Sequence, residues 1–268
     1  MDLLQSALVV LSGAGTDGHV ADPVRLASGI VGPDCVKPAG EALAQPWLDA
    51  GGRILSARDQ EWPDGLRSLG AAAPLLLWTR GTVPRAAAQM VAIVGARHCT
   101  AYGREVTGSL ARVVGEQGRH VVSGGAHGID RAAHTSALDS GAGTVVVAAG
   151  GAGRVYPPGH EQLFERATGH GAVVWEYPPG TRLTQRGFLH RNRLIAAMAS
   201  VTVVVEAAER SGALNTGRSA ADLGRLVFGV PGRLDSPASA GVHRAIADGW
   251  AALLLGPEDL SQMTGSAA

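Results

Sequence analysis

The residues VAIVGARHCTAYG, at positions 91–103, decide the fold class of this chain. A continuous run of Val, Ala and Ile ends at Gly95, and a helical pattern follows from Tyr102. Such an apolar run is typical of a strand that is buried on both faces. The same succession recurs toward the C-terminus. It predicts strands at 91–95, 120–124, 144–150, 172–176, 201–207 and 226–232, and helices at 102–117, 129–138, 160–167, 192–199, 215–223 and 241–247.

Strand–helix alternation predicts an α/β fold with a doubly wound, mostly parallel, extended Rossmann-like sheet, because parallel strands need crossover connections. Residues 53–85 are predicted to add a strand, a turn and another strand, and short helices are expected over 2–11 and 39–49. The chain thus divides into a short, partly helical N-terminal segment (1–52), an extended Rossmann-like domain (53–255) and a tail (256–268), whose last residues, 261–268, are expected to fray. Most predicted strands end in Gly, Ser or Glu, so ligands are expected at their carboxyl ends.

Composition excludes several classes of protein. Hydrophobic residues make up 46% of the 268 residues and charged ones 17%, which fits a globular protein. The 23 basic and 23 acidic residues cancel, so a nucleic-acid site has to be a local basic patch. Cys35 and Cys99 belong to no Cys/His cluster, which argues against a disulfide scaffold or a zinc site. No apolar stretch approaches the roughly 20 residues that span a bilayer, and we expect a cytoplasmic protein without metal or cofactor.

The loop after the first predicted strand contains Gly95, Ala96 and Arg97. A dinucleotide-binding loop would carry GxGxxG here and an acidic residue at the end of the next strand. Neither is present, since that strand ends at Ser123 and Gly124. What remains is a loop with exposed amides and an arginine before a helix N-terminus. It suits a phosphate, either of a nucleotide or of a DNA backbone.

The second loop lies in SGGAHGIDRAAH (123–134) and has small residues that let a ligand approach its backbone: Ser123, Gly124 and Gly125. The spacing of its histidines matches no metal motif, and no third ligand is evident. We therefore interpret Asp130 and His134 as capping or core residues. His127 remains a candidate loop contact.

The third feature is TRLTQRGFLHRNRLIA (181–196), in which Phe188 lies among four arginines: Arg182, Arg186, Arg191 and Arg193. Cations for phosphates and a ring for base stacking are what a single-strand groove needs. The alternative is a solvated helix start with Phe188 simply buried. No acidic residue occurs between Glu176 and Glu206. The stretch 65–104 is also free of acidic residues and carries five arginines, including Arg97. If the two stretches meet at one sheet edge, they form the local basic patch.

The fourth feature is EAAERSGALNTGRSA (206–220), where Ser211 and Gly212 precede a predicted helix. Amides at such a junction bind anions. Asn215 and Thr216 would lie in the first turns of that helix. The segment lacks the lysine of a Walker A loop, so nucleotide hydrolysis is not expected.

Taken in order, seven stretches of the chain resemble the DNA-processing protein A (DprA/Smf) family: VAIVGAR with AYG, SGGAHGIDRAAH, VYPPGHEQLF, EYPPGT, FLHRNRLIAAM, VVVEAAERSGALNT and GRLVFGVPG. They span about Arg53 to Trp250. The resemblance implies an extended Rossmann-like domain that dimerises and binds single-stranded DNA without cleaving it, so no catalytic residue is expected. It also implies protection of incoming DNA and loading of a RecA-type recombinase in natural transformation.

The family pattern places the DNA pocket at Gly95, Ala96, Arg97, Ser123, Gly124, Gly125, Phe188, Arg191, Asn192, Arg193, Ser211 and Gly212. In this pattern Arg97 and Arg191 would hold phosphates, and Phe188 would stack on a base. Ser211 and Gly212 would supply backbone amides.

The chain departs from the family pattern at several positions. Ala96 replaces a usual serine and Leu189 a common proline. Gly125 and His127 differ from the usual SGLARGID sequence, and Asn215 replaces an aliphatic residue. We expect an N-terminal region shorter than the helical domain of many members, and no winged-helix module after residue 250. The loss of an arginine at 127 is expected to weaken DNA binding.

Three alternatives remain open from the sequence. The first is a nucleotide-monophosphate phosphoribohydrolase of the same fold superfamily, although the glutamate of its PGGxGTxxE loop is missing from ERSGALNTGRSA. The second is a small-ligand carrier that uses the same anion-binding loops. The third is a diverged paralogue that keeps the fold and acts in another pathway.

Overall fold

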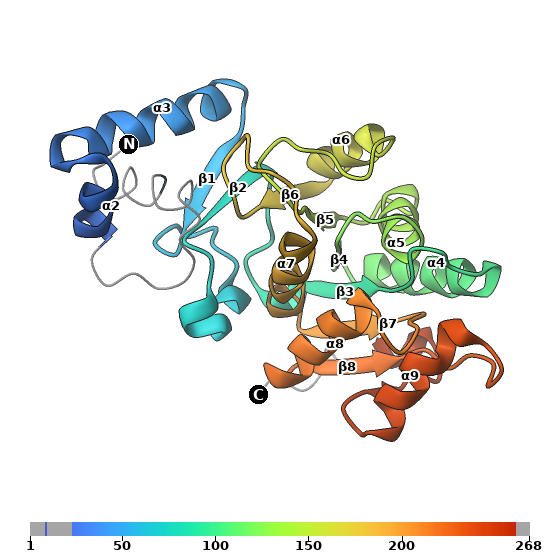
Figure 1. Ribbon diagram of the computed structural model, residues 1–268. Coiled ribbons are helices and arrows are strands. Elements are labelled where there is room, and N and C mark those ends of the chain that lie inside the picture. The colour runs from blue at the N-terminus through green and yellow to red at the C-terminus, as the bar shows by residue number, and fades with distance from the viewer. Residues whose placement is uncertain (1–8, 10–22, 261–268) are drawn as a thin grey trace.

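The computed structural model describes residue 9 and residues 23–260, which form one mixed sheet with helices on both faces (Figure 1). The strands are β1 (Arg53–Ser56), β2 (Leu76–Gly81), β3 (Met90–Val94), β4 (His120–Ser123), β5 (Thr144–Val147), β6 (Gly171–Trp175), β7 (Val201–Val204), β8 (Leu226–Gly229) and β9 (Ala252–Leu253). They lie in the order β1-β2-β6-β5-β4-β3-β7-β8-β9. Pairing is parallel from β6 to β9 and antiparallel for β1 with β2 and β2 with β6. The predicted mostly parallel α/β sheet is confirmed.

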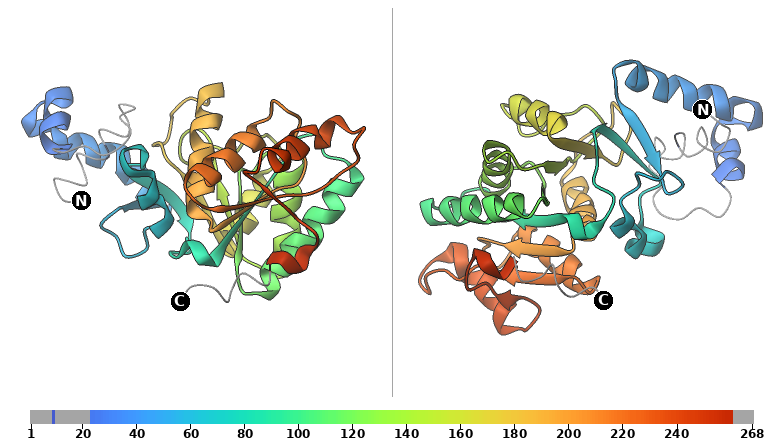
Figure 2. Two further views of the ribbon diagram at one scale, coloured as in Figure 1. Left: turned by 90° about the horizontal axis from the view of Figure 1, so that it is seen from below. Right: turned by 180° about the vertical axis from the view of Figure 1, so that it is seen from behind.

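The crossover helices divide into two layers, so the sheet is doubly wound (Figure 2). The helices are α2 (Pro23–Val31), α3 (Val36–Asp49), α4 (Ala101–Glu116), α5 (Ile129–Asp139), α6 (Glu161–Gly169), α7 (Gln185–Met198), α8 (Gly212–Asp222) and α9 (Pro237–Ala247), with short 3-10 turns at Pro33–Cys35, Asp64–Ala72, Ala87–Gln89 and Pro257–Leu260. Helices α4, α5 and α6 cover one face, and α7, α8 and α9 cover the other.

Both faces of the central strands are buried, as their uninterrupted apolar sequences predict. In β3, Val91 and Ile93 pack with the α4 and α5 layer. Ala92 and Val94 point the other way and pack with the α7 and α8 layer. A central strand of this kind fixes the register of its neighbours, because a slip of one residue would exchange the two faces.

The predicted boundaries differ from the structure by three residues or more at three helix starts and at the ends of three strands, since β5, β7 and β8 end at Val147, Val204 and Gly229. The helix predicted over 192–199 begins at Gln185, because the Thr184 side chain caps it by accepting a hydrogen bond from the Gly187 amide at 3.0 Å. The helix predicted from 215 begins at Gly212 for the same reason, with Ser211 as its cap. The predicted helix over 39–49 is part of α3. The predicted helix over 2–11, apart from residue 9, and the frayed end at 261–268 lie outside the described residues.

The N-terminal helices α2 and α3 lie beyond the β1 edge of the sheet, well away from α8 and α9 (Figure 2). Trp47 anchors α3 there by packing edge-on against Trp78 and Trp175, with ring centroids 6.3 and 5.6 Å away. Its indole nitrogen donates a hydrogen bond to the carbonyl of Arg53 at 3.1 Å. This aromatic cluster joins α3 to β2 and β6.

Candidate functional site

A cavity of about 580 Å³ opens at the carboxyl edge of the sheet, where β3 and β7 lie side by side. Helix α4 follows β3 onto one face and α8 follows β7 onto the other, so the two connections diverge and leave a crevice, as at the switch point of other doubly wound sheets. The lining residues are Val94, Gly95, Arg97, Ala126, Asp130, Leu183, Thr184, Gln185, Phe188, Leu189, Arg191, Asn192, Ile195, Gly212, Ala213 and Thr216.

The loop after β3 brings a cation to the cavity. Gly95 is required there, because a Cβ at this position would lie 2.6 Å from the side chain of Ile129. The Ala96 carbonyl accepts a hydrogen bond from the Ile129 amide at 3.1 Å, which ties the loop to α5. Arg97 is exposed, and its guanidinium carbon lies 5.3 Å from the centre of the Phe188 ring. The loop therefore holds a cation against an aromatic ring at the cavity.

Phe188 lies in the first turn of α7 and is half-buried. One side of the ring packs against Tyr156, with centroids 5.1 Å apart, while the ring also lines the cavity. The segment is thus a helix start, as the alternative interpretation had it, but the ring is not simply buried. It combines a fixed position with access to a ligand.

The loop after β4 lies outside the cavity lining and supports the residues next to it. The Ser123 hydroxyl is fully buried and donates to the carbonyl of Ile93 at 2.7 Å. Gly124 accepts a hydrogen bond from Arg191, and a Cβ on Gly124 would collide with that guanidinium. Gly125 has a φ of 76°, which favours glycine. None of these three predicted site residues lines the cavity, so the structure gives them supporting positions.

Arg191 is the buried cation of the cavity. Its guanidinium donates to the carbonyl of Gly124 at 2.7 Å and to that of Val147, so it joins the loops after β4 and β5. Burial lowers the pKa of Arg191 to about 10, against the opposing charge of Asp130. Burial likewise raises the pKa of the Asp130 carboxyl, although Arg191 and donated hydrogen bonds act in the other direction. The two side chains interact electrostatically and are both held largely out of water.

Asn192 joins α7 to the start of α8. Its side-chain amide donates to the carbonyl of Gly212 at 3.1 Å and to Oδ1 of Asn215 at 3.4 Å. Ser211 caps α8 by accepting from the Leu214 amide at 3.3 Å. The asparagine at 215, where the family pattern has an aliphatic residue, thus has a polar partner. Gly212 lines the cavity, whereas Ser211 does not.

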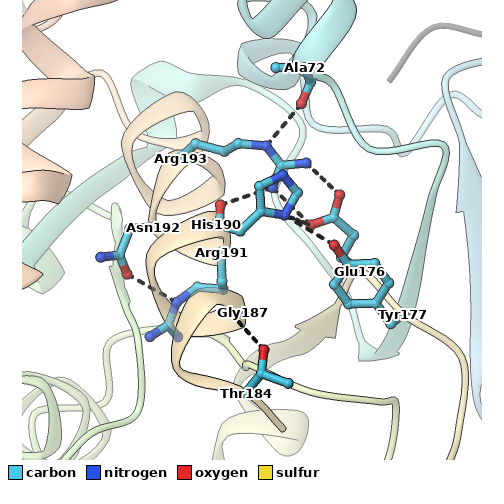
Figure 3. A network of polar contacts seen from close by, with 9 residues as sticks. All are labelled: Ala72, Glu176, Tyr177, Thr184, Gly187, His190, Arg191, Asn192 and Arg193. Atoms are coloured by element: carbon cyan, nitrogen blue, oxygen red, sulfur yellow. Dashed lines mark hydrogen bonds and ion pairs between the residues drawn. The ribbon is translucent and has the colours of Figure 1, made fainter. Parts of the chain in front are cut away.

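Arg193 leaves α7 on a different side from Arg191 (Figure 3), and it is not among the residues that line the cavity. It forms an ion pair with the buried Glu176 and donates to the carbonyl of Ala72 at 2.9 Å. His190 lies on the same side, 3.6 Å from the Glu176 carboxylate. The structure therefore places Arg193 in a contact between α7, the end of β6 and the turn at residue 72. Glu176, which bounds the acid-free stretch in the sequence, was the available signal for this pairing.

The two acid-free basic stretches meet only in part. Of their arginines, Arg97 and Arg191 line the cavity. Arg85 instead pairs with Asp64 at 3.2 Å, and the guanidinium of Arg80 lies over the ring of Trp47. Arg182 and Arg186 are exposed outside the cavity lining. The expectation of one merged patch is therefore wrong for most of these side chains, because sequence distance from an acid says nothing about partners from other elements.

The histidines and Asp130 of the second loop have packing contacts. His134 is fully buried, and its Nδ1 lies 2.7 Å from the hydroxyl of Thr144. Asp130 accepts from the Ala126 amide at 3.3 Å, as a capping residue does, but it also lines the cavity. His127 packs edge-on against His160 at 4.8 Å. Asp130, Thr184 and Gln185 were not predicted as cavity residues from the sequence. Thr184 is a residue type that caps helices, so it could have indicated that α7 begins at Gln185 and brings both residues to the cavity.

Within residue 9 and residues 23–260, no group of three or more His, Cys, Asp or Glu side chains is arranged to hold a metal ion. No helix in the same part of the chain is long and apolar enough to cross a membrane.

Comparison with known proteins gives consistent matches. The family model of DNA recombination-mediator protein A matches residues 53–265. The DNA processing protein DprA of Bacillus subtilis is 32% identical to this chain, and the match covers 77% of this chain and 70% of the relative. The DprA protein of Streptococcus pneumoniae is 35% identical, and the match covers 71% of this chain and 67% of the relative. A Mycobacterium tuberculosis protein named for DprA is 46% identical over 80% of this chain, and the match spans 58% of that relative's length.

Solved structures agree with the sequence matches. The crystal structure of DNA processing protein A from S. pneumoniae superposes with a TM-score of 0.74 at 30% identity, covering 97% of this chain and 92% of the other. That of the Helicobacter pylori protein gives 0.70 at 25% identity, covering 80% and 95%, and it is described for its single-stranded DNA binding mode.

Proposed function

The chain belongs to the family of DNA recombination-mediator protein A, and from that premise we propose that it binds single-stranded DNA in the cavity between β3 and β7 without cleaving it. The observation that carries the proposal is the position of Arg97 against the ring of Phe188 at a cavity that also contains the Arg191 guanidinium. A cation beside an aromatic platform serves the two parts of a nucleotide, the phosphate and the base. The single-stranded DNA binding described for the H. pylori relative supports it.

The roles of the site residues follow from their accessibility. Arg97 is exposed and is proposed to hold a phosphate, while Phe188 stacks on a base. Arg191 contributes positive potential from its buried position and fixes the loops, since its donors are engaged with backbone carbonyls. The Gly212 backbone at the start of α8 is proposed to face a second phosphate. Arg193 acts at a distance by holding α7.

The biological role is proposed from the family. A recombination mediator that holds a single strand can protect incoming DNA and load a RecA-type recombinase onto it in natural transformation, in the cytoplasm and as a homodimer. The loading role is tested by asking whether the protein starts ATP hydrolysis by RecA on single-stranded DNA that is covered by single-strand-binding protein. Sedimentation equilibrium tests whether the protein is a dimer. RecA activity that stays inhibited at saturating protein would contradict the loading role.

Fluorescence anisotropy of labelled poly-dT over a salt series tests DNA binding directly, with the wild type, Arg97→Ala and Phe188→Ala. We expect tight binding with a negative salt slope, and Arg97→Ala should flatten that slope by about 0.7, the value for one phosphate of a single strand. Phe188→Ala should lose about 1–3 kcal/mol of binding free energy and keep the slope. A wild type that binds duplex as well as single strands at low salt would contradict the proposal. Release of ribose 5-phosphate from AMP would instead support the phosphoribohydrolase alternative.

A further inference from the structure

A second hollow, of about 470 Å³, lies next to the cavity and shares Arg97 with it. It runs between the start of α4 and the length of α5 from its N-cap Gly128 to Ser136. Its remaining lining is Cys99, Arg104, Gly128, Arg131, Ala132, Thr135 and Ser136. We call this hollow the arginine groove. Because Arg97 belongs to both walls, a chain that leaves the cavity past Arg97 enters the groove directly.

The arginine groove carries three exposed cations that other groups do not neutralise. Arg97, Arg104 and Arg131 have no carboxylate within ion-pair distance among the residues the structure describes. No Asp or Glu is among the groove's lining residues. By contrast, many exposed arginines of this chain pair with acids, for example Arg166 with Asp139 and Arg233 with Asp235. Like charges gathered in a hollow without counter-charges favour a polyanion.

The groove's other residues suit a sugar–phosphate backbone and do not suit bases. Thr135 and Ser136 are partly exposed hydroxyl donors one turn beyond Arg131 on α5. No aromatic side chain lines the groove, so bases have no stacking platform there. Arg104 is held at the wall, because its guanidinium donates to the carbonyl of Cys99 at 3.1 Å. A fixed cation with free donors can contact a phosphate at little entropic cost.

From this arrangement we infer that the arginine groove binds the backbone phosphates of the single strand where it continues out of the cavity. Phe188 and the cavity hold a base-stacked segment, and the groove holds the next nucleotides by charge alone. This inference rests on the proposed function and assigns Arg104 and Arg131 to it. It predicts that the site is longer than the cavity and that the added length is independent of sequence.

Strand length separates the two sites. Anisotropy is measured with labelled poly-dT of about five and about twenty nucleotides, since single-strand modules span about 4–16 nucleotides. We expect Arg131→Gln and Arg104→Gln each to weaken binding of the long strand about three- to tenfold and to flatten its salt slope by about 0.7. Binding of the short strand should change less than about twofold. Phe188→Ala should weaken both lengths.

Arg112→Gln is the matched control, because Arg112 is an exposed arginine on α4 that lies outside the groove lining. It should leave both lengths unchanged. Long-strand binding that Arg131→Gln and Arg112→Gln leave equally intact would overturn the inference while the proposed function stands. Equal weakening of short and long strands by Arg131→Gln would also overturn it, because the groove would then not be a separate stretch. A wild type that binds neither length would instead overturn the proposed function itself.

Discussion

Arg97 and Arg191 line the same cavity, but they differ in what surrounds the guanidinium. Arg97 is exposed and touches the face of Phe188, so it is available to a ligand and contributes little to the fold. Arg191 is only 7% exposed, beside the buried Asp130, and its donors are engaged with the carbonyls of Gly124 and Val147. Removal of Arg191 takes the hydrogen-bond donor from both carbonyls and the nearby positive charge from the Asp130 carboxyl. Removal of Arg97 leaves no buried group unsatisfied.

We therefore expect Arg191→Met to lower the free energy of unfolding by about 3–5 kcal/mol, the usual cost of removing the countercharge beside a buried ionisable group. Arg97→Met should change it by less than about 0.5 kcal/mol. Urea unfolding followed by tryptophan fluorescence measures both. Equal stabilities for the two variants would show that the Arg191 contacts are not energetically important. The comparison also shows which variant is a clean probe of DNA binding, because only Arg97→Met leaves the fold intact.

His134 makes the stability depend on pH. Burial lowers its pKa from 6.5 to about 3, with smaller contributions from neighbouring charges. Thr144 donates its single hydroxyl hydrogen to the carbonyl of Val121, so its oxygen accepts from Nδ1 of the neutral histidine. Between pH 3 and 6.5 the unfolded chain binds a proton at this residue and the folded chain does not. Stability therefore rises with pH across this range and is lost on acidification.

The expected slope from His134 is about 1.4 kcal/mol per pH unit below about pH 6. In His134→Leu the apolar side chain keeps the packing, and Thr144 keeps its bond to Val121. Urea unfolding of the wild type and this variant at several pH values isolates the contribution, since all other groups are shared. Parallel plots of unfolding free energy against pH would contradict it.

At the scale of elements, the sequence predicted the parallel strands well, but it placed three of the six helix starts three or more residues late. Six of the seven parallel strands were identified, because each of these is an apolar run, a property that is local in the sequence. The two-residue β9 was not predicted. The start of α7 was placed seven residues late, because the segment before Arg191 is polar and its cap depends on one threonine hydroxyl. Phe188 lies in that first turn, so the error in the predicted start of α7 falls on the part of the helix that lines the cavity.

The cap of α7 can be tested through binding. Thr184→Ala removes the acceptor for the Gly187 amide and should cost about 1 kcal/mol of stability. Because the freed turn carries Phe188, we expect weaker poly-dT binding and faster amide exchange at Gly187 and Phe188. Thr184→Ser keeps the hydroxyl and should restore both. Loss of affinity in the alanine variant without any change in amide exchange would point to a direct ligand contact of Thr184 in place of a cap.

For the whole molecule, the net charge of zero gives no information on which arginines lie near one another or pair with acids. The sequence indicated a local patch, but it could not show that Arg193 pairs with Glu176 or that Arg85 pairs with Asp64, since these partners come from other elements. Nor could it show that Arg131, absent from the predicted site, lies beside Arg97. Contacts between distant segments decide which charges are free. Six of the twelve predicted site residues line the cavity, because the motifs are loops at one sheet edge.

The two ends of the sheet are expected to act independently. Trp47 fixes α3 against Trp78 and Trp175 at the β1 side, whereas the cavity lies between β3 and β7. Trp47 is 4% exposed, so Trp47→Ala should cost about 3–5 kcal/mol of packing. Trp47→Phe should cost less, because most of the ring contact remains.

Poly-dT binding, measured well below the unfolding transition, should stay within about twofold of the wild type for both Trp47 variants. The reason is that additivity holds for sites that share no partners, and β5 and β4 separate the Trp47 cluster, which reaches Trp175 on β6, from β3. A loss of affinity in Trp47→Ala as large as that in Phe188→Ala would mean that the N-terminal segment shapes the DNA site through the sheet. Retained affinity would assign residues 36–49 to stability and leave strand binding to the loops at the carboxyl edge.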